Sequence, residues 1–372
     1  MPGPKLLDLL FIDHCPECNG GAQISLLLLF QALLDAGVSA NCIMPGRSKL
    51  LPIRNQEFPI IRMIFNAVYI RLIVLKRKPK FIYCNSLRDR IMCCLCPQSR
   101  VLTHLRDVPV PAHKKVFAIL PSRSVIVSSS YMEDSASKLG ISSILVPNIV
   151  LFSGSQKELT TAKRKETTGK ESRPIRAIMV SNYVPWKKHP LAIEAVSILR
   201  QKGMDITLDI WGDDILGENR KYTETVRFAA GKSSGAVALI QGRRLEDSEF
   251  AQYDFLLHCA ENEPFGRVIV EALGNGCPCV VHDSGEPPRL VRRFQGGTIF
   301  ALATPEAICA AVTSLIESYA SIKTQLALRL SEIQQEFSSE NSLRSLQRLG
   351  ILSVPHTIPS ETLRDIAPAP TA

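Results

Sequence analysis

Short apolar runs alternate with longer amphipathic segments along the N-terminal part of the chain. Residues 6–12 form an apolar run that is typical of a buried strand, and residues 22–36 carry the Leu, Phe and Ala spacing of a helix that ends at Gly37. Further strand-like runs lie at residues 38–44, 81–83, 101–104 and 124–129. This alternation predicts a parallel sheet that is covered by helices on both faces.

The same alternation restarts at residue 175. Residues 175–180 predict a strand, and residues 190–201 predict a helix that ends near Gly203. Further strand-like runs lie at residues 206–211, 236–241, 254–257, 278–282 and 297–300, with helical segments at 266–273 and 305–335. The 372 residues fit two α/β domains, since a domain commonly has roughly 100–200 residues.

The two halves are separated by residues 153–174, which are polar, charged and nearly free of large apolar side chains. Such a segment cannot bury itself and is typical of a linker or an exposed excursion. Residues 353–372 are rich in Pro, Thr and Ser and predict a disordered tail. We therefore expect an N-terminal domain of residues 1–152 and a C-terminal domain of residues 175–352.

Composition and charge narrow the function classes. Hydrophobic residues make up 45% of the chain and charged residues 21%, which excludes disorder as the main state. The net charge of +9 favours anionic partners such as phosphates, nucleotides or an acidic membrane face. The sequence shows neither signal-peptide features nor a run of roughly 18 apolar residues, so we expect a cytoplasmic protein that does not cross a membrane.

Eleven cysteines, an odd number, are better explained by reduced thiols than by a disulfide framework, which again indicates a reducing cytosol. Cys15 and Cys18 have the spacing of half a zinc site, and Cys93, Cys94 and Cys96 crowd a second segment. Neither group has a clear matching half, and a structural zinc site requires four well-spaced ligands. We therefore expect no metal site.

The strongest candidate site is the segment from His258 to Leu273, HCAENEPFGRVIVEAL. A short strand leads into it, a Pro and a Gly turn the chain, and an apolar helix follows. The N–H groups of the first helical turn would suit an anion. The carboxylates of Glu263 and Glu271 would hold sugar hydroxyls by hydrogen bonds. Two glutamates at this spacing also occur on solvated helix faces, so the surrounding residues carry the specificity.

With its continuation, EPFGRVIVEALGNGCPCVV, this segment resembles the signature of retaining glycosyltransferases of the GT-B fold, family-four type, also called glycosyl transferases group 1. The resemblance implies an α/β protein of two Rossmann-like doubly wound domains that face a central cleft. It implies that Glu263 and the backbone amides that follow contact the transferred sugar, and that Glu271 holds the nucleotide ribose. The residues that follow Glu263 in this role are Phe265, Gly266, Arg267 and Val268.

Residues 180–190, VSNYVPWKKHP, resemble the part of the family's donor domain where a lysine meets the donor diphosphate. Lys187 is the matching residue, and a flexible ammonium suits a diphosphate that gains charge as its sugar leaves, without a metal ion. Asn182 departs from the pattern, because many members carry an arginine there. Either Lys188 or Arg243 substitutes for that arginine, or the donor is held more weakly. The alternative is that the two lysines form a solvated patch.

Several glycines also match the family's strand ends. Gly20 and Gly21 resemble the pair that lets the backbone approach the diphosphate, although a Gly-Gly pair is more often only a turn. Gly212 and Arg243 resemble strand ends that border the nucleobase pocket. Gly285 begins a segment, GEPP, that resembles the family's glycine-rich loop but lacks its second glycine and a following acid.

His104 ends the predicted strand 101–104, near the place where family members often carry a histidine or a basic residue. The resemblance implies a position that faces the donor sugar or the acceptor. A histidine there could hydrogen-bond a sugar hydroxyl or help to manage the acceptor proton near neutral pH. The alternative is a core or loop histidine whose hydrogen bonds are satisfied within the fold.

Residues 60–80, IIRMIFNAVYIRLIVLKRKPK, predict an apolar helix that contains arginines and has a basic end. Two interpretations stay open. In the first, the helix packs on the sheet of the N-terminal domain. In the second, it lies on an anionic membrane by its apolar face and basic rim, which would bring the protein to a lipid-linked acceptor.

The resemblance implies transfer of a hexosyl unit from a nucleotide diphosphate sugar, such as UDP-glucose or GDP-mannose, with retention at the anomeric carbon. The acceptor would be a hydroxyl of a glycan, a lipid-linked sugar or a small molecule, as in polysaccharide biosynthesis. Glu263, Lys187 and His104 are the residues expected at the reacting groups. We expect no cofactor and no nucleic-acid partner.

Two alternatives stay open. The first is a non-catalytic scaffold that binds nucleotide sugars, which the departures at Asn182 and Gly285 favour. The second is a nucleotide-sugar epimerase of the same architecture, which would need an acid and a base beside the sugar carbon. A phosphorylase-like enzyme with pyridoxal phosphate is discounted, because it usually has a far longer chain.

Overall fold

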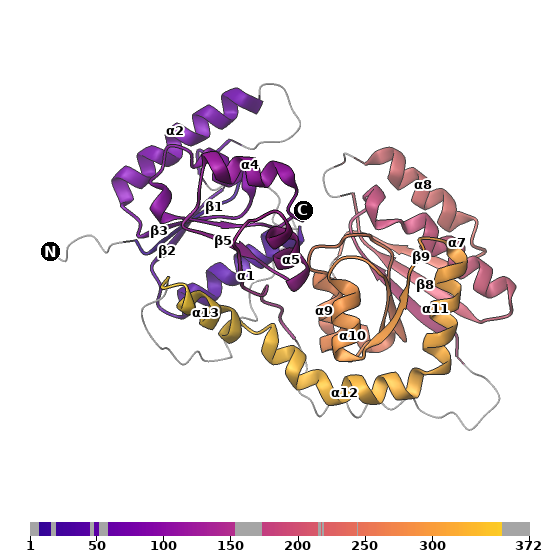
Figure 1. Cartoon of the computed structure of the whole chain (residues 1–372). Helices are drawn as coiled ribbons and strands as arrows, with labels where there is room; N and C mark the ends of the chain where they lie inside the picture. The colour runs from indigo at the N-terminus through magenta and orange to yellow at the C-terminus, as the bar shows by residue number, and fades with distance from the viewer. Residues whose placement is uncertain are drawn as a thin grey trace. The chain divides into compact units, whose positions relative to one another are not determined.

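The computed structural model describes residues 7–15, 20–44, 48–51, 59–152, 173–214, 217, 219–243 and 245–351. The chain divides into two compact units, each built around its own sheet (Figure 1). Unit 1 comprises Met1–Ile149 and Phe337–Ala372, and unit 2 comprises Val150–Glu336. Apart from residues 173 and 174, the predicted linker and tail lie outside the described residues.

Unit 1 contains a six-stranded parallel sheet in the order β2-β1-β3-β4-β5-β6. Its strands are β1 (Leu9–Ile12), β2 (Ala40–Ile43), β3 (Phe81–Cys84), β4 (Val101–His104), β5 (Ser124–Val127) and β6 (Ile144–Leu145). Its helices are α1 (Gly21–Asp35), α2 (Pro59–Arg77), α3 (Leu87–Met92), η1 (Gln98–Arg100), α4 (Pro111–Ile119), α5 (Ser130–Lys138) and α13 (Ser339–Arg348).

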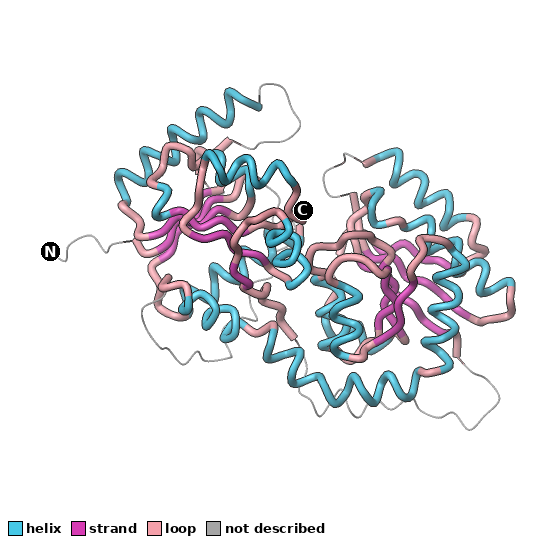
Figure 2. Tube along the Cα trace, viewed as in Figure 1, coloured by secondary structure: helices cyan, strands magenta, loops and turns pink. Residues whose placement is uncertain are grey.

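Unit 2 contains a second six-stranded parallel sheet in the order β12-β11-β10-β7-β8-β9. Its strands are β7 (Ile175–Val180), β8 (Ile206–Trp211), β9 (Val237–Ile240), β10 (Phe255–His258), β11 (Cys279–His282) and β12 (Gly297–Phe300). Its helices are η2 (Pro185–Lys187), α7 (His189–Gln201), α8 (Arg220–Gly231), η3 (Asp247–Gln252), α9 (Arg267–Gly274), α10 (Pro287–Phe294), α11 (Pro305–Glu317) and α12 (Tyr319–Glu336). The strands of each unit lie between helices (Figure 2).

The structure has the predicted alternation of strands and helices. This alternation was predictable because the spacing of apolar residues within each segment determines whether the segment forms a strand or a helix. In β7, Ala177 and Met179 alternate toward the same core, and Leu208 and Ile210 do so in β8. The buried residues of α7 and α11, which pack on each other, belong to that core. Full burial of one large aliphatic side chain contributes about 1.5–3 kcal/mol. The apolar face of each helix therefore determines where it packs.

The strand orders create one topological switch point in each unit. In unit 2 the chain runs from β7 outward to β8 and β9, and then continues on the other side of β7 with β10. In unit 1 the same change of direction lies between β1 and β3. Ligands of open α/β sheets bind outside the carboxyl ends of the strands at such points. The loops after these four strands are therefore the places where a site is expected.

The C-terminal part of the chain departs from the predicted domain boundary. We expected residues 175–352 to form one domain, but residues from Phe337 onward belong to unit 1. Helix α13 packs against α1, and Ser342 Oγ donates a hydrogen bond to Pro147 O over 2.7 Å. A periodicity argument identifies the helix but not the surface against which its apolar side packs.

The predicted helix over residues 305–335 is formed by two helices, α11 and α12, which meet at Ser318. Helix α11 packs on α7, whereas α12 packs on α9 and α10. A single straight helix could not cover both surfaces. Within the described parts of the chain, no helix has the length and apolar character needed to cross a membrane.

Candidate functional site

Two loops at the switch point of unit 2 carry a charged pair. The loop after β7 contains η2, which ends at Lys187, and the loop after β10 contains Glu263. Lys187 Nζ lies 2.5 Å from Glu263 Oε2, and the two side chains are 14% and 13% exposed. These residues are 76 positions apart in the sequence, and they meet because β7 and β10 are neighbouring strands.

The pair fixes the charge state of Glu263. Burial alone would raise the pKa of Glu263, but the ammonium of Lys187 and the contact with His258 lower it well below its ordinary value of 4.5. Glu263 is therefore a carboxylate at neutral pH. Either charge buried alone would lose its hydration without compensation, so the two depend on each other. A phosphate group bound here would compete with Glu263 for the ammonium.

His258 ends β10 and adds a third group to this pair. Its Nε2 lies 3.5 Å from Glu263 Oε2, and its ring is buried. Burial lowers the pKa of His258, so the ring is neutral and one of its nitrogens carries a proton. Neither ring nitrogen has a hydrogen-bond partner within the described part of the chain. The ring can therefore donate a hydrogen bond to Glu263 or to a ligand beside it.

Helix α9 begins immediately after the Glu263 loop. Gly266 is its N-cap residue with a φ of 77°, a conformation that glycine adopts without steric cost. The Gly266 N–H lies 3.4 Å from Glu263 Oε1. A glycine cannot cap the helix with a side chain, and helix N-termini attract anions. One turn further, Arg267 Nε donates to Glu271 Oε1 over 2.9 Å and orients that carboxylate.

The loop after β11 contacts the backbone of Glu263 and holds it in place. Gly285 forms an isolated parallel bridge with Glu263, and the Glu286 N–H donates to Glu263 O over 3.0 Å. Gly285 has a φ of 84°, and a Cβ there would lie 2.5 Å from Glu263 O. The GEPP segment therefore sets the backbone position of Glu263 although it departs from the family pattern.

Gly212, which follows β8, allows the loop after β7 to approach. A Cβ on Gly212 would lie 1.8 Å from Ser181 O. Asn182 is the next residue of that loop and is exposed. The two proposed substitutes for an arginine at Asn182 have other partners. Lys188 forms an ion pair with Glu261. The guanidinium of Arg243 lies 4.2 Å from the ring centre of Trp211 and pairs with Glu249 at 2.6 Å.

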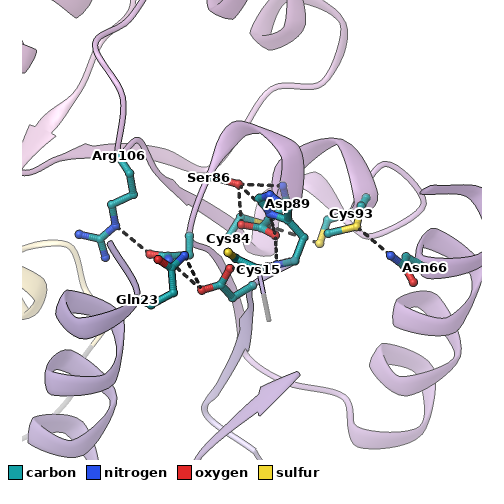
Figure 3. A network of polar contacts seen from close by, with 12 residues as sticks. Cys15, Gln23, Asn66, Cys84, Ser86, Asp89, Cys93 and Arg106 are labelled. Atoms are coloured by element: carbon teal, nitrogen blue, oxygen red, sulfur yellow. Dashed lines mark hydrogen bonds and ion pairs between the residues drawn. The ribbon is translucent and has the colours of Figure 1, made fainter. Parts of the chain in front are cut away.

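A second polar group occupies the switch point of unit 1. Gly20 caps helix α1 and Gly21 begins it. Before them, the loop after β1 carries Asp13 and His14, and residues near the end of β3 complete a hydrogen-bonded network. Figure 3 shows this network with Asp89 near its centre.

His14 and Asp89 form a dyad within this network. His14 Nδ1 lies 3.0 Å from Asp89 Oδ1, and Asp89 also accepts hydrogen bonds from the His14 N–H and from Ser86 Oγ. Burial alone would lower the pKa of His14, but its hydrogen bond to Asp89 and the charge of Asp89 raise it. In the neutral ring with the proton on Nδ1, Nε2 is free to accept a proton or a hydrogen bond. A carboxylate that orients a histidine in this way is typical of a general base.

Asp13 lies beside the dyad, and burial, followed by the charge of Asp89, raises its pKa. Asp13, His14 and Asp89 offer ligand atoms within 4.8 Å of one another, a spacing that also suits a metal ion. However, Asp89 already accepts three hydrogen bonds from His14 and Ser86, which better fits a hydrogen-bonded dyad. The expectation of no metal stays a prediction.

His104 lies in the interior of unit 1 at the end of β4. Its ring is 1% exposed, and its Nδ1 is hydrogen-bonded to the Tyr83 hydroxyl. Burial lowers the pKa of His104 well below 6.5, so the ring is neutral. The burial matches the alternative of a core histidine, but Nε2 has no hydrogen-bond partner in the described part of the chain, so only one of the two ring nitrogens is satisfied. The predicted contact of His104 with a sugar stays a prediction.

Residues 160–336 match the family model described as glycosyl transferases group 1. A curated relative, the GtfA subunit of the UDP-N-acetylglucosamine–peptide N-acetylglucosaminyltransferase of Streptococcus parasanguinis, is 28% identical over 137 residues, which are 34% of this chain and 26% of that protein. CapJ of Staphylococcus aureus is 28% identical over 106 residues, 28% of this chain and 26% of that protein. The matched segment is thus about a quarter of each relative's length.

Solved structures match almost the whole chain. Anabaena HepE in complex with UDP-glucose has a TM-score of 0.71 at 19% identity, over 93% of this chain and 100% of that chain. Sucrose-phosphate synthase of Thermosynechococcus elongatus has a TM-score of 0.75 at 16% identity, over 92% and 98%. The fold is therefore GT-B, and residues 160–336 are similar to the group 1 glycosyl transferases. The resemblance predicted from the sequence is confirmed.

Three of the groups described above had no role assigned from the sequence: His258, which begins the candidate segment, His14 and Asp89. His258 stood directly before the acidic motif, and its place at a strand end was the available signal. His14 and Asp89 offered no local pattern, because 75 positions separate them.

Proposed function

We propose that the chain is a retaining glycosyltransferase with its donor site at the switch point of unit 2. The observation that carries this proposal is the contact between Lys187 and Glu263 beside the N-terminus of α9. A cation and a helix N-terminus suit a diphosphate, and a fixed carboxylate suits sugar hydroxyls. The HepE structure with UDP-glucose favours a UDP-sugar, with a GDP-sugar as the alternative.

In the proposed mechanism, Lys187 shifts part of its interaction from Glu263 to the donor diphosphate. Glu263 then accepts hydrogen bonds from the hydroxyls of the sugar, and Glu271, oriented by Arg267, accepts them from the ribose. Charge accumulates on the diphosphate as the glycosidic bond breaks, and the ammonium and the helix N-terminus stabilise it. The departing diphosphate assists the incoming hydroxyl on the same face, so the proposal needs no side-chain nucleophile, metal or cofactor.

We place the acceptor hydroxyl at the dyad of His14 and Asp89 in unit 1. The acceptor hydroxyl donates a hydrogen bond to His14 Nε2, which is open because Asp89 holds the proton of Nδ1. The hydroxyl proton passes to Nε2 as the new glycosidic bond forms, and the diphosphate leaves with the electron pair of the bond that breaks. The acceptor class is a glycan, a lipid-linked sugar or a small hydroxylated molecule. We also propose a cytoplasmic location, which the buried thiols of unit 2 at Cys259, Cys277, Cys279 and Cys309 support.

Donor binding is the first test. Calorimetric titration should show that the protein binds one of UDP, GDP and ADP, with UDP expected. Glu271→Ala removes the ribose carboxylate and should weaken binding by about 10- to 100-fold, because a hydrogen bond to a charged group contributes about 1.5–3 kcal/mol. Glu340→Ala is the matched control, since Glu340 also pairs with an arginine one helical turn away, but in unit 1. It should leave binding unchanged.

The reaction products separate the remaining alternatives. A transferase releases nucleoside diphosphate and glycosylates an added acceptor, whereas an epimerase returns a changed nucleotide sugar. A scaffold binds the nucleotide sugar and changes neither substrate. Absence of binding to all three nucleotides would contradict the proposed function.

The proposed role of the His14–Asp89 dyad in acceptor binding can be tested separately from donor binding. Asp89→Asn keeps the shape but no longer favours the proton on His14 Nδ1, so transfer to an acceptor should fall by about 10²–10⁴-fold, the range of general-base contributions. Donor affinity should stay within about twofold of the unmodified protein, because Asp89 belongs to unit 1.

The pH profile of transfer is a second measurement, because loss of the carboxylate should lower the pKa of His14. Asp134→Asn, on helix α5 of the same unit, is the matched control. An Asp89→Asn variant with full transfer activity would exclude the dyad from the reaction.

A further inference from the structure

Helix α2 has two apolar sides, and only one of them is covered. Asn66, Ala67, Ile70 and Val74 are buried against the rest of unit 1. The opposite side carries seven large apolar residues whose exposed fractions run from 46% to 70%. We call these residues the α2 stripe: Ile60, Ile61, Ile64, Phe65, Val68, Leu72 and Leu75. Their spacing of three or four positions places most of them along one line of the helix.

This exposure is concentrated in one place. Seven of the seventeen exposed large hydrophobic residues in the described part of the chain belong to the α2 stripe. Single exposed apolar residues are normal on soluble proteins, but a contiguous patch marks an interaction site. Helix α2 runs along the outer side of unit 1 (Figure 1). With 19 residues it is about 28 Å long.

The charges around the stripe identify the chemistry of the partner. Residues 59–80 contain six lysines and arginines and no aspartate or glutamate. Lys76, Arg77 and Lys78 are exposed and follow the last residues of the stripe. Lys80 is exposed as well and pairs with Asp8. An apolar stripe with a purely basic end complements a surface that is apolar inside and anionic outside.

We propose that unit 1 docks on an anionic lipid surface through the α2 stripe. The helix lies in the plane of the interface, with its apolar stripe among the acyl chains and its basic end at the headgroups. This inference extends beyond the proposed function and does not depend on it. If both hold, the acceptor class narrows to molecules that are anchored in a membrane.

Vesicle flotation with the full chain tests the proposal. The protein should float with vesicles of phosphatidylcholine and phosphatidylglycerol, and binding should weaken at least about tenfold on phosphatidylcholine alone. The triple variant Ile61→Ser, Ile64→Ser and Leu72→Ser should lose binding by at least about tenfold, since it removes the inserted apolar surface. Because these side chains are exposed, the variant should fold as the unmodified protein does, with the same thermal unfolding midpoint within a few degrees.

Two further variants sharpen the test. A control with Ile119→Ser, Phe228→Ser and Leu328→Ser removes equally exposed apolar side chains from other helices and should keep full vesicle binding. Changing Lys76 and Arg77 to Gln should weaken vesicle binding by about fivefold for each residue. Added salt should also weaken vesicle binding, because it screens the attraction between the basic residues and the anionic headgroups.

Three outcomes would overturn the proposal. The first is a protein that does not float with anionic vesicles. The second is a triple variant that binds them as well as the unmodified protein. The third is a protein that does not bind vesicles but forms a concentration-dependent dimer in light scattering, when the triple variant stays monomeric. That result would assign the α2 stripe to contact with a second copy of this chain.

Discussion

Lys187→Ala is expected to lower the rate of sugar transfer by about 10²–10³-fold, the usual effect of removing one group that stabilises charge in the transition state. The same change leaves Glu263 as a nearly buried carboxylate without its cation. Breaking a buried ion pair on one side costs about 3–5 kcal/mol. We therefore expect a clear drop in the free energy of unfolding as well as in activity, measured by denaturant titration and by release of nucleoside diphosphate.

A second variant separates these two effects. Glu263→Gln in the Lys187→Ala background removes the unpaired carboxylate, so stability should recover while transfer stays lost. Burial alone would raise the pKa of Glu263, but Lys187 lowers it, so the pair stabilises the fold above pH 4.5 and its contribution is lost as the pH falls through the lowered pKa. The single variant and the unmodified protein should therefore approach each other in stability in acid. Transfer by Lys187→Ala within about twofold of the unmodified protein would remove Lys187 from the mechanism.

The sequence predicted most of the elements because strand and helix periodicity is a local property. Residues 175–180, 206–211 and 297–300 were predicted with the bounds that the structure has. The two residues of the donor pair were also predicted, Lys187 in the loop after β7 and Glu263 in the loop after β10. Their direct contact follows from the order of the strands in the sheet, which a local pattern does not contain.

Features that depend on non-local packing were not predictable. The alternation pattern of residues 60–80 left two interpretations open, because a helix that is apolar on both sides does not show which side is covered. The structure shows that one side packs on unit 1, as in the first interpretation, and that the other side is exposed. The membrane contact of the second interpretation stays a proposal. In the same way, the bridge between Gly285 and Glu263 links loops that are more than twenty positions apart, so the GEPP segment looked weak in the sequence.

Gly285→Ala is expected to impair transfer without changing any charge or functional side chain. The residue has a φ of 84°, and the new Cβ would lie 2.5 Å from Glu263 O and 2.6 Å from Glu263 N. These are backbone atoms, so the loop after β10 must move. Displacement of a reacting group by about 1 Å can cost about 10²-fold in rate. We expect a loss of about 10- to 100-fold in kcat, and a stability loss of at least about 1–2 kcal/mol from the left-handed backbone alone.

Gly203→Ala separates the clash from the backbone strain. Gly203 ends the turn after α7 with a φ of 89°, and a Cβ there would meet no atom within 4 Å. This control should lose a similar 1–2 kcal/mol, about the cost of the left-handed backbone, and keep its kcat. If Gly285→Ala lost stability but kept its kcat, as expected for Gly203→Ala, then the loop after β11 would have no role in holding Glu263 for transfer. A selective loss of kcat at Gly285, with UDP affinity less affected, would show that the backbone of Glu263 must be held in place for transfer.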